Sequence, residues 1–368
     1  MSTLFASSTA GMAGPLWYNS ATLGSKHRVL RREETGVANQ MARQLQLALI
    51  GCGGMGTVLG HSLNALEGAR IAVCCDIDEA RLTEATNALG ADQSVLDYKA
   101  AIADPGVDAV IIATPNHLHA QMAIDAARAG KHVYTEKPMA LSVADCDAMI
   151  AAAKIAGVKL TVGQVLRYIG HFAKAKQIVE SGELGKPYAI EIDRIGLQPS
   201  RSDWRSTKAE TGGMLPEVNV HELDFMAYVL GDPISIYAQS GHFGDNNYDF
   251  DDELFAIVRF EGGAIGSLHA SFCAQIGRYH GKILCEKGAI FFGHAPGEVI
   301  IKRPNAEPEP LDISDVPDPH QRELGEFLEA IHTDSEPKIT GADGRRAIGM
   351  CQGADISAET GRVVKLPL

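Results

Sequence analysis

Short apolar runs alternate with segments of helical spacing through the first part of the chain. The runs are three to six residues long, which suits short buried strands, and most are followed by a segment whose apolar residues recur every three to four positions. This alternation predicts a doubly wound parallel sheet with helices on both faces. The expected strands are residues 45–50, 71–75, 110–112, 132–134 and 160–162.

The pattern changes after about Gly163. After one helix at residues 172–179, apolar residues mostly alternate with polar ones at a period of two, which predicts antiparallel strands. Strands are expected near residues 190–192, 254–260, 265–272, 283–292 and 299–301, a loop at 303–319, and helices at 322–331 and 345–357.

Three segments follow from these patterns. Residues 1–43 are rich in Ser, Ala and Gly without periodicity, so we expect a poorly ordered extension, with Met41 as an alternative start. Residues 44–165 are expected to form the first domain. Residues 166–368 are expected to form an α+β domain with a large open, mostly antiparallel sheet. The predicted fold class is therefore α/β with a second α+β domain.

Charge and cysteine usage narrow the functional classes. The formal net charge of −13 argues against binding to nucleic acid or to an anionic membrane surface. No apolar run is long enough to span a membrane. The seven cysteines are scattered and show no C-x-x-C spacing, which is typical of a reducing compartment, so we expect a cytoplasmic protein.

A glycine motif joins the first strand to the first helix. The sequence Gly51-Cys52-Gly53-Gly54-Met55-Gly56 has the G-x-G-x-x-G spacing that lets a backbone approach a pyrophosphate at a helix N-terminus. The next strand ends in Asp76, which can accept hydrogen bonds from a ribose diol and would repel a 2′-phosphate. Ile77 follows, and no arginine is adjacent. The pattern predicts a Rossmann domain that binds NAD.

Further candidates lie where the later strands end, the edge at which open α/β sheets bind ligands. Thr114 and Asn116 follow the third clear strand, and Glu136 and Lys137 follow the next. His119 lies one turn into the intervening helix, expected at residues 117–129, and is expected to be structural or to position the cofactor.

A helix in the second domain carries an acid and a histidine. Glu217, His221 and Asp224 have i, i+4 and i+7 spacing, which would place them on one helix face. A carboxylate one turn before a histidine can orient the ring and raise its basicity. A zinc site would need a third protein ligand that the sequence does not offer, so no metal is expected and an acid/base pair is favoured.

These motifs together resemble the glucose–fructose oxidoreductase, inositol dehydrogenase and rhizopine catabolism (Gfo/Idh/MocA) family. The resemblance rests on the glycine motif, Thr114 to Asn116 with His119, Glu136-Lys137-Pro138 and the helix of Glu217 and His221. It extends over about residues 45–368, including the segment from Gly341 to Arg346.

The resemblance implies a site for an oxidoreductase. Lys137 and His221 would be the catalytic pair, and Glu217 would take the place of the family's usual aspartate. Gln164 stands where His or Asn is frequent and would contact the cofactor, and Asn219 replaces a common glycine. Beside the catalytic residues, the side chains of Arg167 and Trp204 would contact the substrate.

The expected reaction is NAD-dependent oxidation of a secondary hydroxyl on a sugar, inositol or glycoside. Either His221 or a Lys137 with a depressed pKa could accept the hydroxyl proton, and the sequence leaves both open. Two other functions are also open: an NAD-dependent glycosidase acting through transient oxidation, and a non-catalytic dinucleotide sensor or repressor. We expect a homo-oligomer, a dimer or tetramer formed through the C-terminal sheet.

Overall fold

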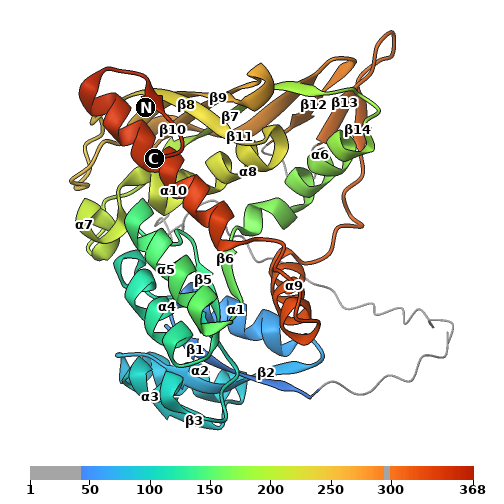
Figure 1. The fold of residues 1–368 in the computed structure, drawn as a ribbon. Coiled ribbons are helices and arrows are strands. Elements are labelled where there is room, and N and C mark those ends of the chain that lie inside the picture. The colour runs from blue at the N-terminus through green and yellow to red at the C-terminus, as the bar shows by residue number, and fades with distance from the viewer. Residues whose placement is uncertain (1–42, 294–298) are drawn as a thin grey trace, which may run out of the picture. The chain divides into compact units, whose positions relative to one another are not determined.

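The computed structural model describes residues 43–293 and 299–368. The expected extension at residues 1–43 therefore lies, except for its last residue, outside the described residues. Residues 42–368 form one compact unit. Its two sheets are separate layers, with the parallel sheet at the bottom of Figure 1 and the second sheet at the top.

The first sheet has six parallel strands in the order β3-β2-β1-β4-β5-β6. Central β1 pairs with β2 on one side and β4 on the other, so the strand order reverses there, and a crevice opens at the carboxyl ends of β1 and β4. The strands are β1 Leu45–Ile50, β2 Ala69–Cys75, β3 Gln93–Val95, β4 Ala109–Ile112, β5 His132–Glu136 and β6 Leu160–Gly163.

Helices cover this sheet, and several begin and end with standard capping residues. The side chains of Asp78, Asp97 and Ser142 accept bonds from first-turn backbone N–H groups, and Gly90 and Gly157 end helices in the left-handed conformation. The helices are α1 Gly54–Asn64, α2 Glu79–Leu89, α3 Tyr98–Ala103, α4 His119–Arg128 and α5 Val143–Ala156, with a 3₁₀ turn at Asn116–Leu118 before α4.

The second sheet has nine strands in the order β14-β13-β12-β11-β7-β10-β9-β8-β15. Its pairs are antiparallel except for the parallel pair of β10 with β7. The strands are β7 Pro187–Leu197, β8 Pro233–Gly241, β9 Glu253–Phe260, β10 Ile265–Ser271, β11 Cys273–Cys285, β12 Gly288–Phe292, β13 Val299–Lys302, β14 Glu309–Leu311 and β15 Val364–Lys365.

One face of this sheet is covered by helices, with α8 and α6 lying beneath it in Figure 1. Strand β9 alternates strictly between buried and outward-facing residues, which is the pattern of a sheet with one covered face. The helices of this part are α6 Gly170–Ser181, α7 Lys208–Thr211, a π-helix at Leu215–Asn219, α8 Val220–Leu230, α9 Pro319–His332 and α10 Gly341–Thr360, and 3₁₀ turns lie at Val165–Tyr168, Trp204–Ser206 and Glu261–Gly263.

Helix α9 returns to the first sheet although it comes late in the chain. Its buried residues Leu324, Phe327 and Leu328 join the core that β1, β2 and α1 form. The Phe327 ring lies edge-on to Tyr134 of β5, with ring centroids 6.1 Å apart. The first core is thus completed by residues from the far end of the sequence, while the boundary between 44–165 and 166–368 stays a prediction.

The predicted α/β class, with a doubly wound parallel sheet and a second, mostly antiparallel sheet, is confirmed. Four strands were not predicted: β3, β8, β14 and β15. Strand β14 lies in the segment expected to be a loop, and β15 is only two residues long. In the part of the chain that the structure describes, no helix combines the length and the apolar character needed to cross a membrane.

We expect Phe327→Ala to lower the free energy of unfolding by about 3–5 kcal/mol, because it opens a cavity in the core shared by α9 and the first sheet. The measurement is equilibrium unfolding in urea. Phe243→Ala, at a side chain that is 75% exposed, is the control and should change the free energy by less than about 0.5 kcal/mol. Equal stability of the two variants would contradict the packing role of α9.

Candidate functional site

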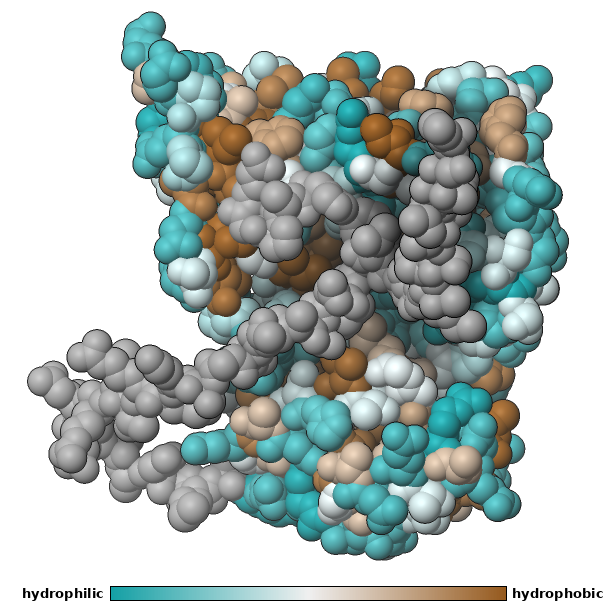
Figure 2. Space-filling view, turned by 180° about the vertical axis from the view of Figure 1, so that it is seen from behind, coloured by the Kyte–Doolittle hydropathy of each residue, from teal (hydrophilic) through white to brown (hydrophobic). Residues whose placement is uncertain are grey.

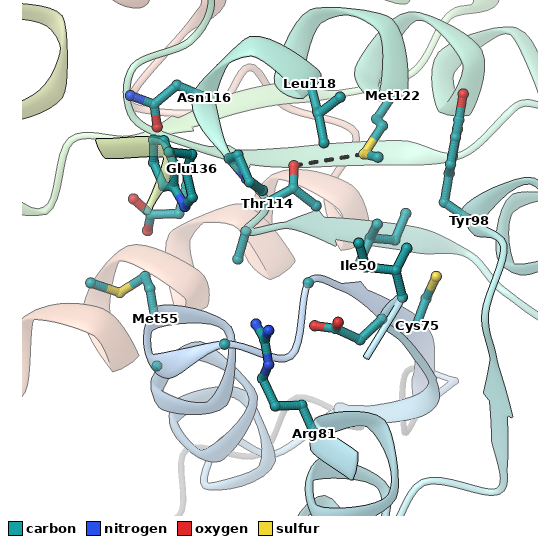
Figure 3. A pocket seen from close by; sticks show the side chains of 18 of the residues that line it. Ile50, Met55, Cys75, Arg81, Tyr98, Thr114, Asn116, Leu118, Met122 and Glu136 are labelled. Carbon is teal, nitrogen blue, oxygen red and sulfur yellow. Dashed lines mark hydrogen bonds between the residues drawn. The ribbon is translucent and has the colours of Figure 1, made fainter. Parts of the chain in front are cut away.

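A cavity of about 740 Å³ lies at the carboxyl ends of β1, β2, β4 and β5. Figure 3 shows Glu136 and Asn116 on the left of the cavity and Cys75 and Tyr98 on the right, with Arg81 at the bottom of the view. Trp204, Arg205 and Glu217 of the second domain complete the Glu136 end. The cavity therefore sits at the crevice where the strand order of the parallel sheet reverses.

The glycine loop fits a pyrophosphate. Gly51 has φ +94°, and a Cβ there would lie 2.6 Å from the Ala113 carbonyl oxygen. A Cβ on Gly56 would lie 1.9 Å from the Gly51 carbonyl oxygen. Gly53 and Gly54 instead face open space along the cavity, and no described side chain caps the first turn of α1. Backbone N–H groups at this helix start are therefore available to an anion.

Asp76 is held rigidly at the other end of the cavity. Its carboxylate accepts bonds from the backbone N–H groups of Cys52 (2.8 Å) and Asp78 (2.9 Å). This fixes an acidic side chain beside the glycine loop, where a ribose diol would lie. The structure adds Arg81, which lines the same cavity and pairs with Asp78 at 3.2 Å. The sequence reading missed this arginine because it lies one turn into α2 rather than next to Asp76.

His119 joins two of the cavity-forming loops from behind. Its ring is fully buried, with Nδ1 2.7 Å from the Pro138 carbonyl oxygen and Nε2 2.9 Å from the Thr114 carbonyl oxygen. Burial lowers the pKa of His119, so the ring is neutral and donates one of these bonds at a time. The residue does not line the cavity, and it positions the loops that follow β4 and β5.

Glu136 is a buried carboxyl that still borders the cavity. It accepts a bond from the backbone N–H of Lys137 at 3.1 Å. Burial raises the pKa of Glu136 to about 7, against the opposing effect of the Lys137 charge. Near neutral pH this side chain therefore exists in both protonation states.

Lys137 reaches across the cavity to the second domain. Its Nζ donates a bond of 2.6 Å to the main-chain carbonyl of Glu217. Glu217 lies inside the π-helix at Leu215–Asn219, whose wider turn places the backbone differently from an α-helix. The charged end of Lys137 is thus fixed at one point of the cavity wall.

The Glu217 side chain does not orient His221 as the sequence suggested. Its carboxylate accepts a bond from Asn116 Nδ2 at 2.7 Å and pairs with Arg205 Nε at 3.4 Å. The reason is geometric: the π-helix ends and α8 begins between Glu217 and His221, so the spacing of a regular α-helix does not apply. Glu217 instead links the two domains at the cavity's edge.

Gln164 takes the orienting role. His221 Nδ1 lies 2.9 Å from Gln164 Oε1. With the amide oxygen as acceptor, a proton on Nδ1 would be donated to it and Nε2 would keep its lone pair. Burial, with the positive charges of Lys137 and Arg194, lowers the pKa of His221 well below its usual value. His221 is therefore a neutral imidazole at neutral pH.

Arg167 is not available to a substrate in this arrangement. Its guanidinium is buried and makes two bonds of 2.6 Å to Asp224, plus an ion pair of 3.1 Å to Asp343. The expectation that Arg167 contacts the substrate is therefore corrected. Its N–H donors bond instead to Asp224 of α8 and Asp343 of α10, and these contacts connect both helices to the segment after β6. Asp224, which we expected on the face of Glu217 and His221, serves the same contact.

Most of the expected site residues are brought to one cavity, and five are not. The five that do not line the cavity are Gly56, His119, Gln164, Arg167 and His221. The structure adds Leu96, Asp97 and Tyr98, which follow the short strand β3 that the sequence did not reveal. The expected residues that line the cavity are Gly51, Gly53, Gly54, Met55, Asp76, Ile77, Thr114, Asn116, Glu136, Lys137, Trp204 and Glu217.

Comparison with known proteins assigns the two halves of the chain. Residues 45–164 match the model of the oxidoreductase family with an NAD-binding Rossmann fold, and residues 172–291 match the GFO/IDH/MocA C-terminal domain. The prediction of an NAD-binding oxidoreductase is thereby confirmed.

The relatives found include sugar and inositol dehydrogenases. Myo-inositol 2-dehydrogenase of Thermotoga maritima is 28% identical over 88% of this chain and 98% of its own. scyllo-Inositol 2-dehydrogenase (NAD(+)) of Bacillus subtilis is 28% identical over 89% of this chain and 97% of its own. Among solved structures, levoglucosan dehydrogenase in complex with NADH and levoglucosan superposes with a TM-score of 0.82, at 25% identity over 88% of this chain and 100% of that one. The chain belongs to the Gfo/Idh/MocA family of NAD-binding oxidoreductases.

Proposed function

We propose that the protein oxidises a secondary hydroxyl of a sugar, inositol or glycoside with NAD. The observation that carries the proposal is the pairing of a fixed Lys137 ammonium with a neutral, oriented His221 near the Glu136 end of the cavity. Bound NAD would supply the hydride acceptor. Gly51, Gly53, Gly54 and Asp76 would hold its pyrophosphate and adenosine ribose at the opposite end.

His221 is the proposed proton acceptor. Oxidation of an alcohol removes the hydroxyl proton while hydride leaves carbon, and the free Nε2 lone pair of His221 can take that proton. The bond from Nδ1 to Gln164 holds the ring in this tautomer. The nearby positive charge of Lys137 disfavours a lasting imidazolium, so His221 readily passes the proton on.

Lys137 is proposed to stabilise the reacting oxygen. Its Nζ has three donors, and the bond to the Glu217 carbonyl uses one of them. The remaining donors can bond the alcohol oxygen as negative charge develops on it. Because the Glu217 carbonyl fixes the ammonium in advance, little reorganisation is needed when the substrate binds.

The cavity rim supports a polyhydroxylated substrate. Asn116, Glu217 and Arg205 offer donors and acceptors for several hydroxyls, and Trp204 offers an apolar ring beside them. Relatives named for myo-inositol, scyllo-inositol and levoglucosan support the same substrate class.

A screen for NAD⁺ reduction across inositols, aldoses, sugar acids and glycosides tests the proposed function. Formation of NADH, measured by absorbance, is expected with at least one of these classes. Cleavage of a glycoside without net NADH would instead favour the glycosidase. NAD binding with no turnover of any class would favour the sensor.

Substitution of the catalytic pair should separate chemistry from cofactor binding. Lys137→Ala and His221→Ala should each lower kcat by roughly 10²-fold or more, because each removes a group that serves the proton transfer. Glu217→Gln should be milder, since the main-chain carbonyl that holds Lys137 remains. Steady-state kinetics on the substrate found by the screen and calorimetric NAD titration are the measurements.

The two effects should not add, because Lys137 and His221 serve one step, so the double variant should be little worse than the poorer single one. NAD affinity should change only modestly in each variant. A His221→Ala variant with near-normal turnover would show that the proposed proton acceptor is wrong.

Cofactor preference should follow Asp76. We expect kcat/KM to favour NAD over NADP by about tenfold or more, since the fixed carboxylate repels a 2′-phosphate. Asp76→Ser combined with Ile77→Arg should lower the ratio of kcat/KM for NAD to that for NADP. Arg81→Ala should raise this ratio, because it removes the cation that lines the cavity. Equal kcat/KM for both cofactors in the unchanged protein would refute this role of Asp76.

We also propose that the outer face of the nine-stranded sheet joins copies of this chain. On this face Tyr237 pairs with Ile257 across β8 and β9, and Phe255 stacks on His269 of β10. Phe255 and Ile257 are each more than half exposed. Figure 2 shows apolar side chains gathered on the upper part, where Figure 1 places this sheet. Contiguous exposed apolar residues on a sheet face are typical of an interface.

Ile257→Lys should shift the protein toward a smaller assembly, measured by light scattering coupled to size-exclusion chromatography, because a buried charge would oppose association. Ile155→Lys is the control, since Ile155 is 88% exposed on α5, away from the sheet face, and should leave the molar mass unchanged. An unchanged molar mass in Ile257→Lys would contradict the proposed interface.

A further inference from the structure

Behind the Glu136 end of the cavity lies a buried group of three acidic side chains that the proposed reaction does not use. The hydroxyl of Tyr134 in β5 lies 2.8 Å from Glu323 Oε2 of α9 and also beside the Glu136 side chain, so its single proton serves one of the two carboxyl groups at a time. The Tyr134 hydroxyl and the Glu136 carboxyl both lie beside Gly163. A Cβ on Gly163 would lie 2.8 Å from the Tyr134 hydroxyl and 3.0 Å from Glu136 Oε1. We call Glu136, Tyr134 and Glu323 the acid triad.

The triad is closed to solvent except where Glu136 borders the cavity. Tyr134 is fully buried and Glu323 is 3% exposed. The second carboxyl oxygen of Glu323, Oε1, is buried without a hydrogen-bond partner among the described residues. A buried carboxylate oxygen with no donor is costly, and a neutral carboxyl avoids burying an uncompensated charge there. Glu323 is therefore held as the neutral acid.

Charged groups around the triad reinforce this assignment. Burial and the charge of Glu136 raise the pKa of Glu323 well above its usual range. The charge of Glu326 raises this pKa further, and the charge of Arg167 lowers it. For Glu136, burial and Glu217 raise the pKa, and Lys137 lowers it. Two carboxyls thus share one hydroxyl, with Glu323 protonated and Glu136 poised near neutrality.

The geometry points to the acid triad as a proton store coupled to the charge of the nicotinamide ring. Glu136 would be ionised when the oxidised, positively charged ring lies at its end of the cavity, and would hold a proton when the ring is reduced and neutral. The inference goes beyond the proposed reaction. It depends only on NAD binding with the nicotinamide at the Glu136 end.

The proton balance of alcohol oxidation agrees with this role. In the proposed reaction, bound NAD would accept hydride from the alcohol carbon, and the hydroxyl proton would end on the Glu136 carboxylate, forming a carboxyl O–H as the carbonyl forms. One positive charge on the ring and one negative charge on Glu136 disappear together. The buried end of the cavity therefore carries no net change of charge, which a low-dielectric site favours.

Proton exchange on cofactor binding tests the inference without any substrate. Calorimetric titrations with NAD⁺ and with NADH at pH 7, each in phosphate and in Tris, give the number of protons exchanged, because the two buffers differ in ionisation enthalpy. Since Glu136 titrates near pH 7, NAD⁺ should release about half a proton and NADH should take up about half a proton. The same proton number for both cofactors would overturn the inference.

Three variants assign the exchange to the triad. Glu136→Gln should reduce the difference between the two cofactors to near zero. Tyr134→Phe removes a bond that lowers the pKa of Glu136, so the midpoint of the exchange should move to higher pH. Tyr248→Phe is the matched control, since its hydroxyl bonds the Pro199 carbonyl away from the triad, and its proton exchange should equal that of the unchanged protein.

A parent-like difference in Glu136→Gln would place the titrating group elsewhere and contradict the inference. If the proton numbers behave as expected while the screen finds no oxidised substrate, the proton store stands and the proposed dehydrogenase function fails. The two proposals are thus tested separately.

Discussion

The hydrogen bond from Lys137 Nζ to the Glu217 carbonyl joins the parallel sheet to the second domain at the reacting end of the cavity. The residues on either side depend on it. Lys137 follows β5 at the edge where the parallel sheet offers its ligand site, and Glu217 stands in a π-helix that leads into the helix of His221. With the ammonium fixed, its charge keeps His221 neutral and opposes the protonation of Glu136. Together with burial, this contact thus influences the charge states of two neighbouring groups, His221 and Glu136.

Burial sets the rest of the site's electrostatics. His221 and Glu136 are both under one-tenth exposed, and in both cases burial is the main cause that favours the neutral form. The acid triad lies beneath them, and α9 supplies its Glu323 while also supplying Phe327 to the first core. The helix that completes the packing of the parallel sheet therefore also closes the reacting end of the cavity from behind. Helix α9 thus contributes both to the stability of the first core, through Phe327, and to the protonation of the acid triad, through Glu323.

Local sequence patterns predicted much of this site because many of its residues belong to short contiguous motifs. The strand, glycines, helix and Asp76 of the dinucleotide loop depend on short-range geometry, and so does the placement of Lys137 after β5. Contacts that cross the fold could not be read in the same way. Gln164 replaces Glu217 as the partner of His221 because a π-helix breaks the expected spacing, and Arg167 turns to Asp224 and Asp343, far away in sequence. Strand β8 and the return of α9 to the first core likewise depend on tertiary packing rather than on local periodicity.

A crystal structure of the protein with NAD⁺ would show the direction in which the dinucleotide lies, and the proposed roles of Asp76, Lys137 and His221 depend on that direction. The predicted result places the adenosine ribose against Asp76, the pyrophosphate on the start of α1 and the nicotinamide beside Glu136 and Lys137. The Lys137 ammonium and His221 Nε2 should then face the nicotinamide carbon that accepts hydride. A nicotinamide bound at the Asp76 end, or Lys137 and His221 turned away from it, would contradict the proposed binding direction and the proposed roles of these two residues.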